Sequence, residues 1–316
     1  MINGILEEIA AHKSFLITTH ESPDGDAVGS SLALANYLKG LGKDVTVYLC
    51  DRVPDIYMFL PLADTVLHTL PERSFDVCFV LDVGEFRRAG KEISNASGIG
   101  KFVNIDHHLN CDRFGAINYL DPQACATGAL IYRIIAAAGH EVDYETALCI
   151  YTAIITDTGS FRYSNANPEA FDIAGKMVEK GINAWSVAEK LYESQPQNRL
   201  GLLALALATL SVSTRGDYAS VAVTLDMYDK CHADAELTDG FINYPRSIRG
   251  VEVAIFFREI RNGEFKVGFR SKGKVDVSKL AEAFSGGGHH NAAGCNVTGS
   301  LPEVKQLVFD LLEKSL

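Results

Sequence analysis

The 316-residue sequence lacks the features that mark several common classes of protein. Its seven cysteines contain no Cys-x-x-Cys spacing and are odd in number, which argues against a zinc site and against a disulfide framework. The longest apolar run, residues 200–210, is too short to cross a bilayer, and the N-terminus has no charged-then-apolar signal pattern. We therefore expect reduced thiols, a cytoplasmic location and no membrane partner.

The sequence also lacks a surplus of basic residues. Its formal net charge is −11, whereas the binding of long duplex nucleic acid depends on many lysine and arginine contacts to phosphate. A long duplex is therefore not expected as a partner. A short anionic ligand is compatible with this charge, because acidic residues gathered around metal cations lower the formal net charge of the chain while leaving the site itself much less negative.

What the sequence does contain is a sizeable apolar fraction with two periodicities. With 47% hydrophobic residues, the chain can bury a large core and is expected to form two domains. Short apolar runs of the kind found in buried strands alternate with helical patterns, which favours a mostly parallel sheet flanked by helices. The apolar runs are 14–19, 44–49, 75–83 and 101–106, and the helical patterns are 26–42, 127–139, 144–159 and 168–181.

The second half of the chain has a different pattern. We expect an α/β domain over residues 1–184, a helical linker over 185–210 and a smaller mixed α/β domain over 211–316. In this last part, apolar stretches surround an Arg-Asn-Gly sequence that is typical of a hairpin turn, and a helical pattern occupies the C-terminal end.

Acidic residues and histidines follow the predicted strands of the first domain. They are His20, Asp24 and Asp26 after the first strand, Asp82 after the third, Asp106, His107 and His108 after the fourth, and Asp157 late in an apolar helical pattern. Because the carboxyl ends of strands border the ligand crevice in open α/β sheets, separate segments can deliver these groups to one place. Carboxylates gathered in this way must take up protons or bind cations, and neutral imidazoles beside them are ready metal ligands. The set matches the needs of two divalent ions about 3.5 to 4 Å apart.

Each of these residues also has a purely structural alternative. Asp24 and Asp26 could form a turn and a helix N-cap, Asp82 could close a strand, and the histidine doublet could be fortuitous. Asp157 is harder to explain in this way, because a lone acid at the end of the apolar stretch 149–157 would leave a costly buried charge. Taken together, the residues favour a metal site over a set of coincidences.

Five motifs resemble those of the DHH/DHHA1 phosphoesterase family. They are HESPDGD (20–26), LDVG (81–84), DHH (106–108), TDTGSFRY (156–163) and GGGHHNAAG (286–294), and their order spans nearly the whole chain. The resemblance is closest to the bacterial oligoribonuclease (nanoRNase) and 3′-phosphoadenosine 5′-phosphate (pAp) phosphatase type. It implies a catalytic DHH domain, a helical linker, a DHHA1 substrate-binding domain and two divalent metal ions, with Mn²⁺ favoured, in a cleft between domains.

The resemblance also assigns roles to single residues. One ion would be held by His20, Asp24 and Asp82, and the other by Asp26, Asp82, His107 and Asp157, with Asp82 bridging. Asp106 would orient a neighbouring imidazole, and His108 would contact the scissile phosphate or assist proton transfer. The ligand types are also compatible with Mg²⁺, Co²⁺ and Fe²⁺.

The glycine-rich motif of the second domain suggests a phosphate-binding loop. Glycine lets backbone N–H groups approach a phosphate closely, although glycine serves any sharp bend equally well. The resemblance makes Gly287, Gly288 and His289 part of a substrate-binding loop, with Arg270 just upstream. Arg162 is a further phosphate-binding candidate, for which a surface salt bridge is the structural alternative.

The expected activity is hydrolysis of short oligoribonucleotides to 5′-mononucleotides, of pAp to AMP, or of both. One alternative is a phosphodiesterase of the same family that acts on cyclic or linear dinucleotides. A second alternative is a family II inorganic pyrophosphatase, which shares the DHH motif but lacks the GGGH sequence. A third is a non-catalytic nucleotide- or metal-binding regulator, which would not need to retain every metal ligand that the family motif contains. The sequence is compatible with a homodimer as well as with a monomer.

Overall fold

The computed structural model describes residues 1–314, apart from the side chain of His289. It contains two compact units, Met1–Ser194 and the part that begins at Gln195. The division falls inside the predicted linker, where α7 (Ala184–Ala188) continues into a π-helical turn (Glu189–Glu193) and α8 (Gln197–Ala208) follows. The helix is interrupted before Pro196, because proline disfavours the α conformation in the residue that precedes it.

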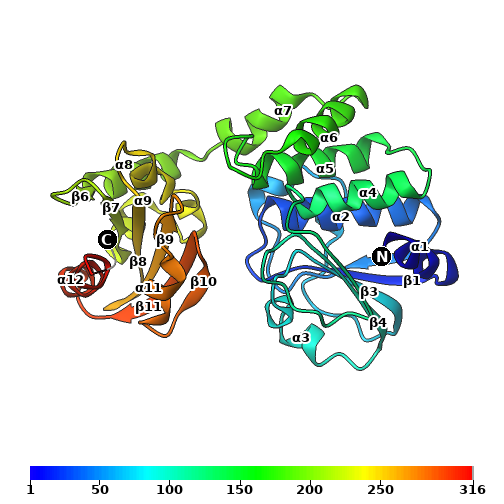
Figure 1. Ribbon diagram of the computed structural model, residues 1–316, viewed down its shortest axis with the longest axis horizontal. Helices are drawn as coiled ribbons and strands as arrows, with labels where there is room; N and C mark the ends of the chain where they lie inside the picture. Colours follow the sequence, from blue (N-terminus) through cyan, green and yellow to red (C-terminus); the bar gives the residue numbers. More distant parts are fainter. Residues whose placement is uncertain (315–316) are drawn as a thin grey trace. The chain divides into compact units, whose positions relative to one another are not determined.

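The first unit is built on a five-stranded parallel sheet with the order β2-β1-β3-β4-β5. Strands β1, β3 and β4 are labelled in Figure 1. The four predicted strands are confirmed, and the sequence pattern missed β5, a short strand at the edge. The strands are β1 (Ser14–Thr18), β2 (Asp44–Val47), β3 (Phe75–Leu81), β4 (Ile99–Asp106) and β5 (Ile117–Leu120).

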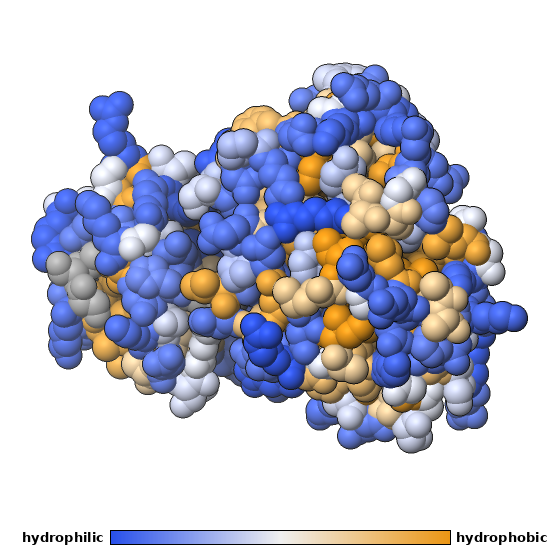
Figure 2. Space-filling view, turned by 45° about the vertical axis from the view of Figure 1, so that its right-hand side comes forward, coloured by the Kyte–Doolittle hydropathy of each residue, from blue (hydrophilic) through white to orange (hydrophobic). Residues whose placement is uncertain are grey.

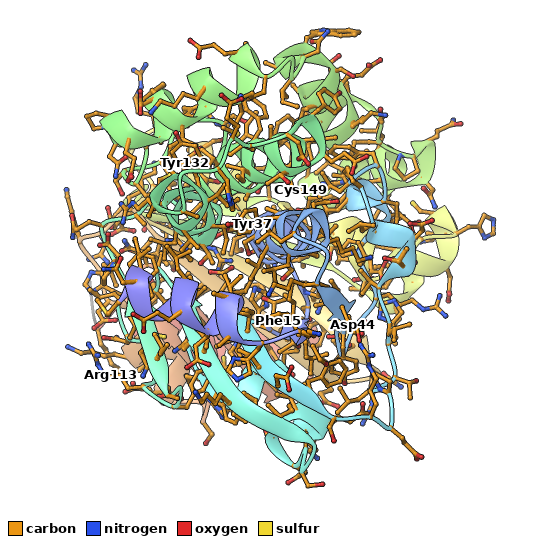
Figure 3. The ribbon with its side chains drawn as sticks, turned by 90° about the vertical axis from the view of Figure 1, so that its right-hand side faces the viewer. Phe15, Tyr37, Asp44, Arg113, Tyr132 and Cys149 are labelled. Carbon is orange, nitrogen blue, oxygen red and sulfur yellow. The ribbon has the colours of Figure 1, made fainter. Side chains whose placement is uncertain are left out.

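Helices cover the two faces of this sheet unequally. Phe15 of β1 lies on the face covered by the larger helices and stacks on Phe79 with ring centroids 5.9 Å apart (Figure 3). Leu16 points to the opposite face, where a smaller cluster packs under α3 (Lys91–Ser94). Burial on both faces explains why the strands appear as continuous apolar runs. The helices of the larger face are α1 (Ile2–Ala11), α2 (Gly25–Gly40), α4 (Thr127–Ala137), α5 (Tyr144–Asp157) and α6 (Pro168–Glu179).

The strand order reverses between β1 and β3. From β1 the chain passes to β2 on one side, and it later returns to place β3 on the other side. In doubly wound sheets, such a reversal of strand order is where ligands bind. His20 follows β1 and Asp82 follows β3, so both predicted site segments border this point.

The second unit contains a six-stranded mixed sheet with the order β10-β11-β9-β8-β7-β6, in which only the β7–β8 pair is parallel. The predicted hairpin is confirmed: β8 and β9 are joined by Asn262 and Gly263, and Gly263 has φ +70°. Helices α11 (Val277–Glu282) and α12 (Leu301–Leu312) pack on one face, and α8 and α9 (Leu225–Cys231) pack on the other, with α10 (Asn243–Ser247) against β7 and β8. The strands are β6 (Ser211–Val212), β7 (Tyr218–Val223), β8 (Val253–Arg261), β9 (Glu264–Ser271), β10 (Gly287–His289) and β11 (Ala292–Thr298).

Candidate metal centre

One group of polar side chains forms where the loops after β1 and β3 meet. The Nε2 atom of His20 lies 3.8 Å from Asp82 Oδ2 and 4.0 Å from Asp24 Oδ1. Asp24 is the N-cap of α2, because its Oδ1 accepts hydrogen bonds from the backbone N–H groups of Asp26 (3.1 Å) and Ala27 (3.0 Å). The cap alternative for Asp24 is therefore confirmed. The same carboxylate nevertheless faces His20, so it can serve both purposes.

A second group forms around His107, in the connection between β4 and β5. Its Nε2 atom lies 3.6 Å from Asp26 Oδ2 and 3.7 Å from Asp157 Oδ2. Asp26 is in the first turn of α2, and Asp157 is the last residue of α5. The sheet and two helices therefore bring together three residues that lie far apart in the sequence.

Asp82 joins the two groups. Its Oδ2 atom faces His20, while its Oδ1 atom lies 3.5 Å from His107 Nε2 and accepts a hydrogen bond of 2.9 Å from the Thr127 hydroxyl. The residue is only 2% exposed. Its two oxygens thus point to different sets of ligands, which is the geometry that a bridging carboxylate requires.

At each of the three histidines of the centre, a neighbouring oxygen lies within hydrogen-bond distance of the Nδ1 atom. Nδ1 of His20 lies 2.7 Å from the Glu21 carbonyl oxygen, and Nδ1 of His107 lies 3.2 Å from that of Ala124. Nδ1 of His108 lies 2.7 Å from Asp106 Oδ1. In a neutral imidazole, an Nδ1–H donated to an oxygen leaves Nε2 unprotonated, and metal-binding histidines use this arrangement.

Asp106 is fully buried and serves as a hydrogen-bond acceptor for the DHH segment. Besides the His108 ring, it accepts from the His108 backbone N–H at 2.8 Å and from the Gly84 N–H at 2.6 Å. These bonds outweigh burial and hold the pKa of Asp106 below its usual value. The carboxylate therefore stays charged, and it orients the His108 imidazole.

The other acids of the centre, of which Asp26 and Asp82 are buried and Asp157 is partly buried, disfavour one another's charged forms. Burial raises the pKa of Asp26 and of Asp82 well above the usual value, and the neighbouring carboxylates add to the effect. Burial likewise raises the pKa of Asp157 to about 6. At His107, burial opposes the charged imidazole, but Asp82, Asp26 and Asp157 together raise its pKa to about 9. Crowded carboxylates such as these favour the binding of cations.

The donor set fits divalent metal ions. Three groups of ligand atoms, each within 4.8 Å, are His20, Asp24 and Asp82; Asp26, His107 and Asp157; and Asp82, His107 and His108. Atoms that bind one ion at about 2.1 Å stand roughly 3 to 4 Å apart, which matches the separations above. Carboxylate oxygen with some imidazole suits Mn²⁺ and Mg²⁺.

Two residues at the start of α4 contribute to this centre, and the sequence pattern missed them. The backbone N–H of Thr127 donates to Asp26 Oδ2 at 2.6 Å, and that of Gly128 donates to Asp26 Oδ1 at 2.9 Å. Together with the Thr127 hydroxyl on Asp82, they place a helix N-terminus against two of the acids. A threonine and a glycine that begin an apolar helical pattern were the available signal.

The predicted substrate-binding residues belong to other segments of the chain. Arg162 is exposed in the loop after α5, where its Nε atom donates to the Gly159 carbonyl oxygen at 2.6 Å. In the second unit, Gly287 and Gly288 do not form an open loop, because β10 pairs with β11. Arg270 of β9 is in register with Ala292 of β11, which in turn is opposite His289 of β10. The His289 side chain is outside the described part of the structure.

Comparison with protein families accounts for both units. Residues 14–154 match the model of the DHH family N-terminal domain, and residues 221–314 match that of the DHHA1 domain. The chain belongs to the DHH family. Among the described helices of this DHH-family protein, none is both long and apolar enough to span a membrane.

Curated relatives of this DHH-family protein match it along nearly its full length. A bifunctional oligoribonuclease and PAP phosphatase NrnA from Thermus thermophilus is 31% identical over 95% of this chain and 89% of its own. The protein of the same name from Bacillus subtilis is 26% identical over 98% of this chain and 97% of its own. The family and these relatives make the chain a hydrolase of phosphoester bonds.

Solved structures agree with the fold. An exopolyphosphatase-related protein from Bacteroides fragilis superposes with a TM-score of 0.93 at 31% identity, over 99% of this chain and 95% of that one. RecJ from Thermus thermophilus, in complex with Mn²⁺, has a TM-score of 0.55 at 13% identity and matches 99% of this chain and 54% of its own. The latter likeness concerns the fold alone.

Proposed function

We propose that this protein hydrolyses short oligoribonucleotides to 5′-mononucleotides and pAp to AMP, using two divalent metal ions of which Mn²⁺ is preferred. The observation that carries the proposal is the position of Asp82, whose two oxygens face separate ligand groups at 3.8 Å and 3.5 Å. The names of the relatives from Thermus thermophilus and Bacillus subtilis supply the substrate classes.

The geometry supports the proposed ligand assignment. His20, Asp24 and Asp82 would hold one ion, and Asp26, Asp82, His107 and Asp157 would hold the other. When bound, such ions supply Lewis acidity, which lowers the pKa of water and stabilises negative charge on a phosphoryl group. The hydrogen bonds from Thr127 and Gly128 would keep the carboxylates of Asp26 and Asp82 in place as ligands.

His108 would act on the substrate. Because Asp106 holds its Nδ1–H, the imidazole presents Nε2, which in its protonated form donates a hydrogen bond to a phosphoryl oxygen or a proton to the leaving oxygen. This division assigns binding of the ion to His107 and proton transfer to His108.

Residues of the second unit would bind the remainder of the substrate. The planar guanidinium of Arg270 can engage a phosphate through two parallel hydrogen bonds. Gly287 and Gly288 have no side chains of their own that would keep a phosphate from their backbone, and we assign them the same role together with His289. Arg162 is assigned a contact with phosphate in the first unit.

Product analysis tests the function. The protein is stripped of metal, supplied with Mn²⁺ or Mg²⁺, and offered pAp, short oligoribonucleotides, a long RNA and cyclic di-AMP in parallel. We expect AMP from pAp and 5′-mononucleotides from the short RNAs, with Mn²⁺ the better activator. Absence of both products with either ion would refute the proposal. Faster turnover of cyclic di-AMP than of either substrate would instead indicate a cyclic-dinucleotide phosphodiesterase.

A further inference from the structure

Arg88 lies beside the candidate metal centre, in the tight turn Phe86–Ala89 that follows β3. Its carbonyl oxygen accepts a hydrogen bond of 2.7 Å from the Glu21 N–H, and its own N–H donates to the Glu85 carbonyl oxygen at 3.0 Å. The loops after β1 and β3 are therefore tied together at Arg88. This contact fixes the Arg88 backbone at the point where the strand order reverses.

The Arg88 guanidinium and the His108 ring border the same space above Gly84. A methyl group placed on Gly84 would lie 3.6 Å from the His108 ring and 3.8 Å from Arg88 Nη1. Gly84 has φ +64°, and its N–H is held by Asp106. A small ligand group resting over Gly84 would thus contact both side chains at once.

The guanidinium is half-buried but incompletely paired. Its Nη1 donates to the Val83 carbonyl oxygen at 3.2 Å, and over residues 1–314 its other N–H groups meet no protein acceptor. A guanidinium carries five donors, so most of them stay available for a ligand. The neighbouring Arg87 differs, because its side chain is 82% exposed and is paired with Glu85 at 2.6 Å.

Charge explains what such a guanidinium could bind. It lies near His20 and His108, and within residues 1–314 it forms no ion pair with the carboxylates of the centre. A phosphoryl group carries acceptor oxygens that match the planar fork of arginine. The free donors of Arg88 and the unfilled space over Gly84 therefore point to an anionic phosphoryl group as the ligand.

We propose that Arg88 is a catalytic residue that contacts a non-bridging oxygen of the substrate phosphoryl group, next to His108. This inference rests on the proposed function. The contact would stabilise charge that develops on the phosphoryl oxygens during hydrolysis. The alternative is a structural residue that only pins the Val83 carbonyl oxygen.

The test compares Arg88→Gln and Arg88→Lys with Arg87→Gln as the matched control. Glutamine keeps an N–H donor for Val83 but removes the charge and the fork. With pAp, we expect Arg88→Gln to lower kcat/KM by about 100-fold, mostly through kcat, and Arg88→Lys to be intermediate. Arg87→Gln should stay within about twofold of the wild type, as expected for an exposed ion pair.

Equilibrium binding supplies a readout that does not depend on turnover. Calorimetry with inorganic phosphate in the presence of Mg²⁺ should show weaker binding to Arg88→Gln than to the wild type and to Arg87→Gln. Metal content and melting temperature should be the same in all three proteins. Loss of metal or a lower melting temperature in Arg88→Gln would show that the residue is structural and would overturn the inference.

The outcomes separate this inference from the proposed function. An active wild type with an equally active Arg88→Gln refutes the role of Arg88 and leaves the proposed function standing. An inactive wild type refutes the proposed function. In that case, the phosphate-binding measurement alone decides whether Arg88 contacts a phosphoryl group. Equal phosphate affinity in wild type and Arg88→Gln overturns the inference in that case as well.

Discussion

Asp82 adopts a backbone conformation that few residues other than glycine tolerate. Its φ is +58°, in the left-handed region where asparagine and aspartate are the least strained of the larger residues. That conformation turns the carboxylate so that one oxygen faces His20 and the other faces His107. Position 82 therefore requires a residue that is charged and that also tolerates the left-handed region.

Asp82→Asn should abolish most hydrolysis without unfolding the protein. Asparagine has the same size and tolerates the left-handed region, so only the shared charge is lost. We expect kcat for pAp to fall by at least about 100-fold and bound metal to decrease. Metal analysis and kinetics on the same preparation check this, with the exposed Asp64→Asn as control. Turnover of folded Asp82→Asn at the wild-type rate would be incompatible with a bridging ligand.

Thr127→Val should weaken the centre while keeping the shape of the side chain. Thr127 is fully buried, and its hydroxyl donates to Asp82 Oδ1 at 2.9 Å. Loss of a partner that orients a ligand typically costs about 10- to 100-fold in metal affinity or activity. Titration of the metal-free protein with Mn²⁺ measures the effect. Thr127→Ser keeps the hydroxyl and should restore most of the affinity, and a serine variant as weak as the valine variant would contradict this role.

Substitutions of the two neighbouring histidines should have different effects on metal content and turnover. His107 Nε2 faces three carboxylates, whereas His108 is held by Asp106. We expect His107→Ala to lower both metal content and turnover, and His108→Ala to lower mainly turnover. Metal analysis beside steady-state kinetics distinguishes the two. Equal loss of metal in both variants would contradict this division of roles.

At the scale of whole elements, the termini of three helices meet at the centre. Helix α2 begins with Asp24 and Asp26, α4 begins with Thr127, and α5 ends with Asp157. Helices α2 and α5 approach closely because Gly25 and Gly29 face α5, with Thr156 next to Gly25. Tyr37 of α2 and Cys149 of α5 are seen on these helices in Figure 3. Close packing of the two helices therefore sets the separation of Asp26 from Asp157.

Gly29→Ala should reduce both stability and activity. The added methyl group would lie 2.7 Å from the Cys149 carbonyl oxygen and 3.0 Å from Ala153, so α2 and α5 must move apart. Overpacking of this kind costs about 1 to 3 kcal/mol in unfolding free energy. Denaturant titration and kinetics with pAp measure both effects. In the control Gly175→Ala, the methyl group meets no atom within 4 Å in the exposed part of α6, and stability should rise by about 0.5 to 1 kcal/mol.

At the scale of the whole molecule, charge opposes the binding of long nucleic acid. The chain carries a net charge of −11, and the face seen in Figure 2 is hydrophilic over much of its area, with apolar residues gathered mainly in the right half of the view. A long RNA gains affinity from every phosphate that meets a lysine or arginine, and it gains little here. A short substrate needs only the few contacts proposed for the centre, Arg88 and Arg270.

Substrate length should therefore matter strongly. We expect kcat/KM for a trinucleotide to exceed that for an RNA of about 24 nucleotides by at least about 10-fold at moderate salt. Initial rates of mononucleotide release at one salt concentration measure the ratio. The resemblance to the oligoribonuclease type implies that the preferred length is about two to five residues. Comparable rates for the trinucleotide and the long RNA would contradict this prediction.

Much of the fold and of the centre could be predicted from local sequence. Strands buried on both faces appear as apolar runs, and polar residues after them stand out, so local patterns alone identify four strands and the eight polar residues of the centre. The edge strand β5 was missed because its Ile-Asn-Tyr-Leu sequence is short and mixed. The glycine-rich segment was expected to be a loop, but pairing with β11 makes it a strand, and pairing between strands is not encoded locally.

The sequence by itself determined which chemical groups are available: carboxylates and imidazoles at strand ends, in an acidic chain with two domains. Only the tertiary structure decided how these groups are arranged, because distances between residues far apart in the chain depend on strand order and helix packing. The two-sided position of Asp82, the support from Thr127 and the place of Arg88 beside His108 all arise in this way. Each depends on contacts between segments that the sequence keeps apart, so no local pattern could reveal them.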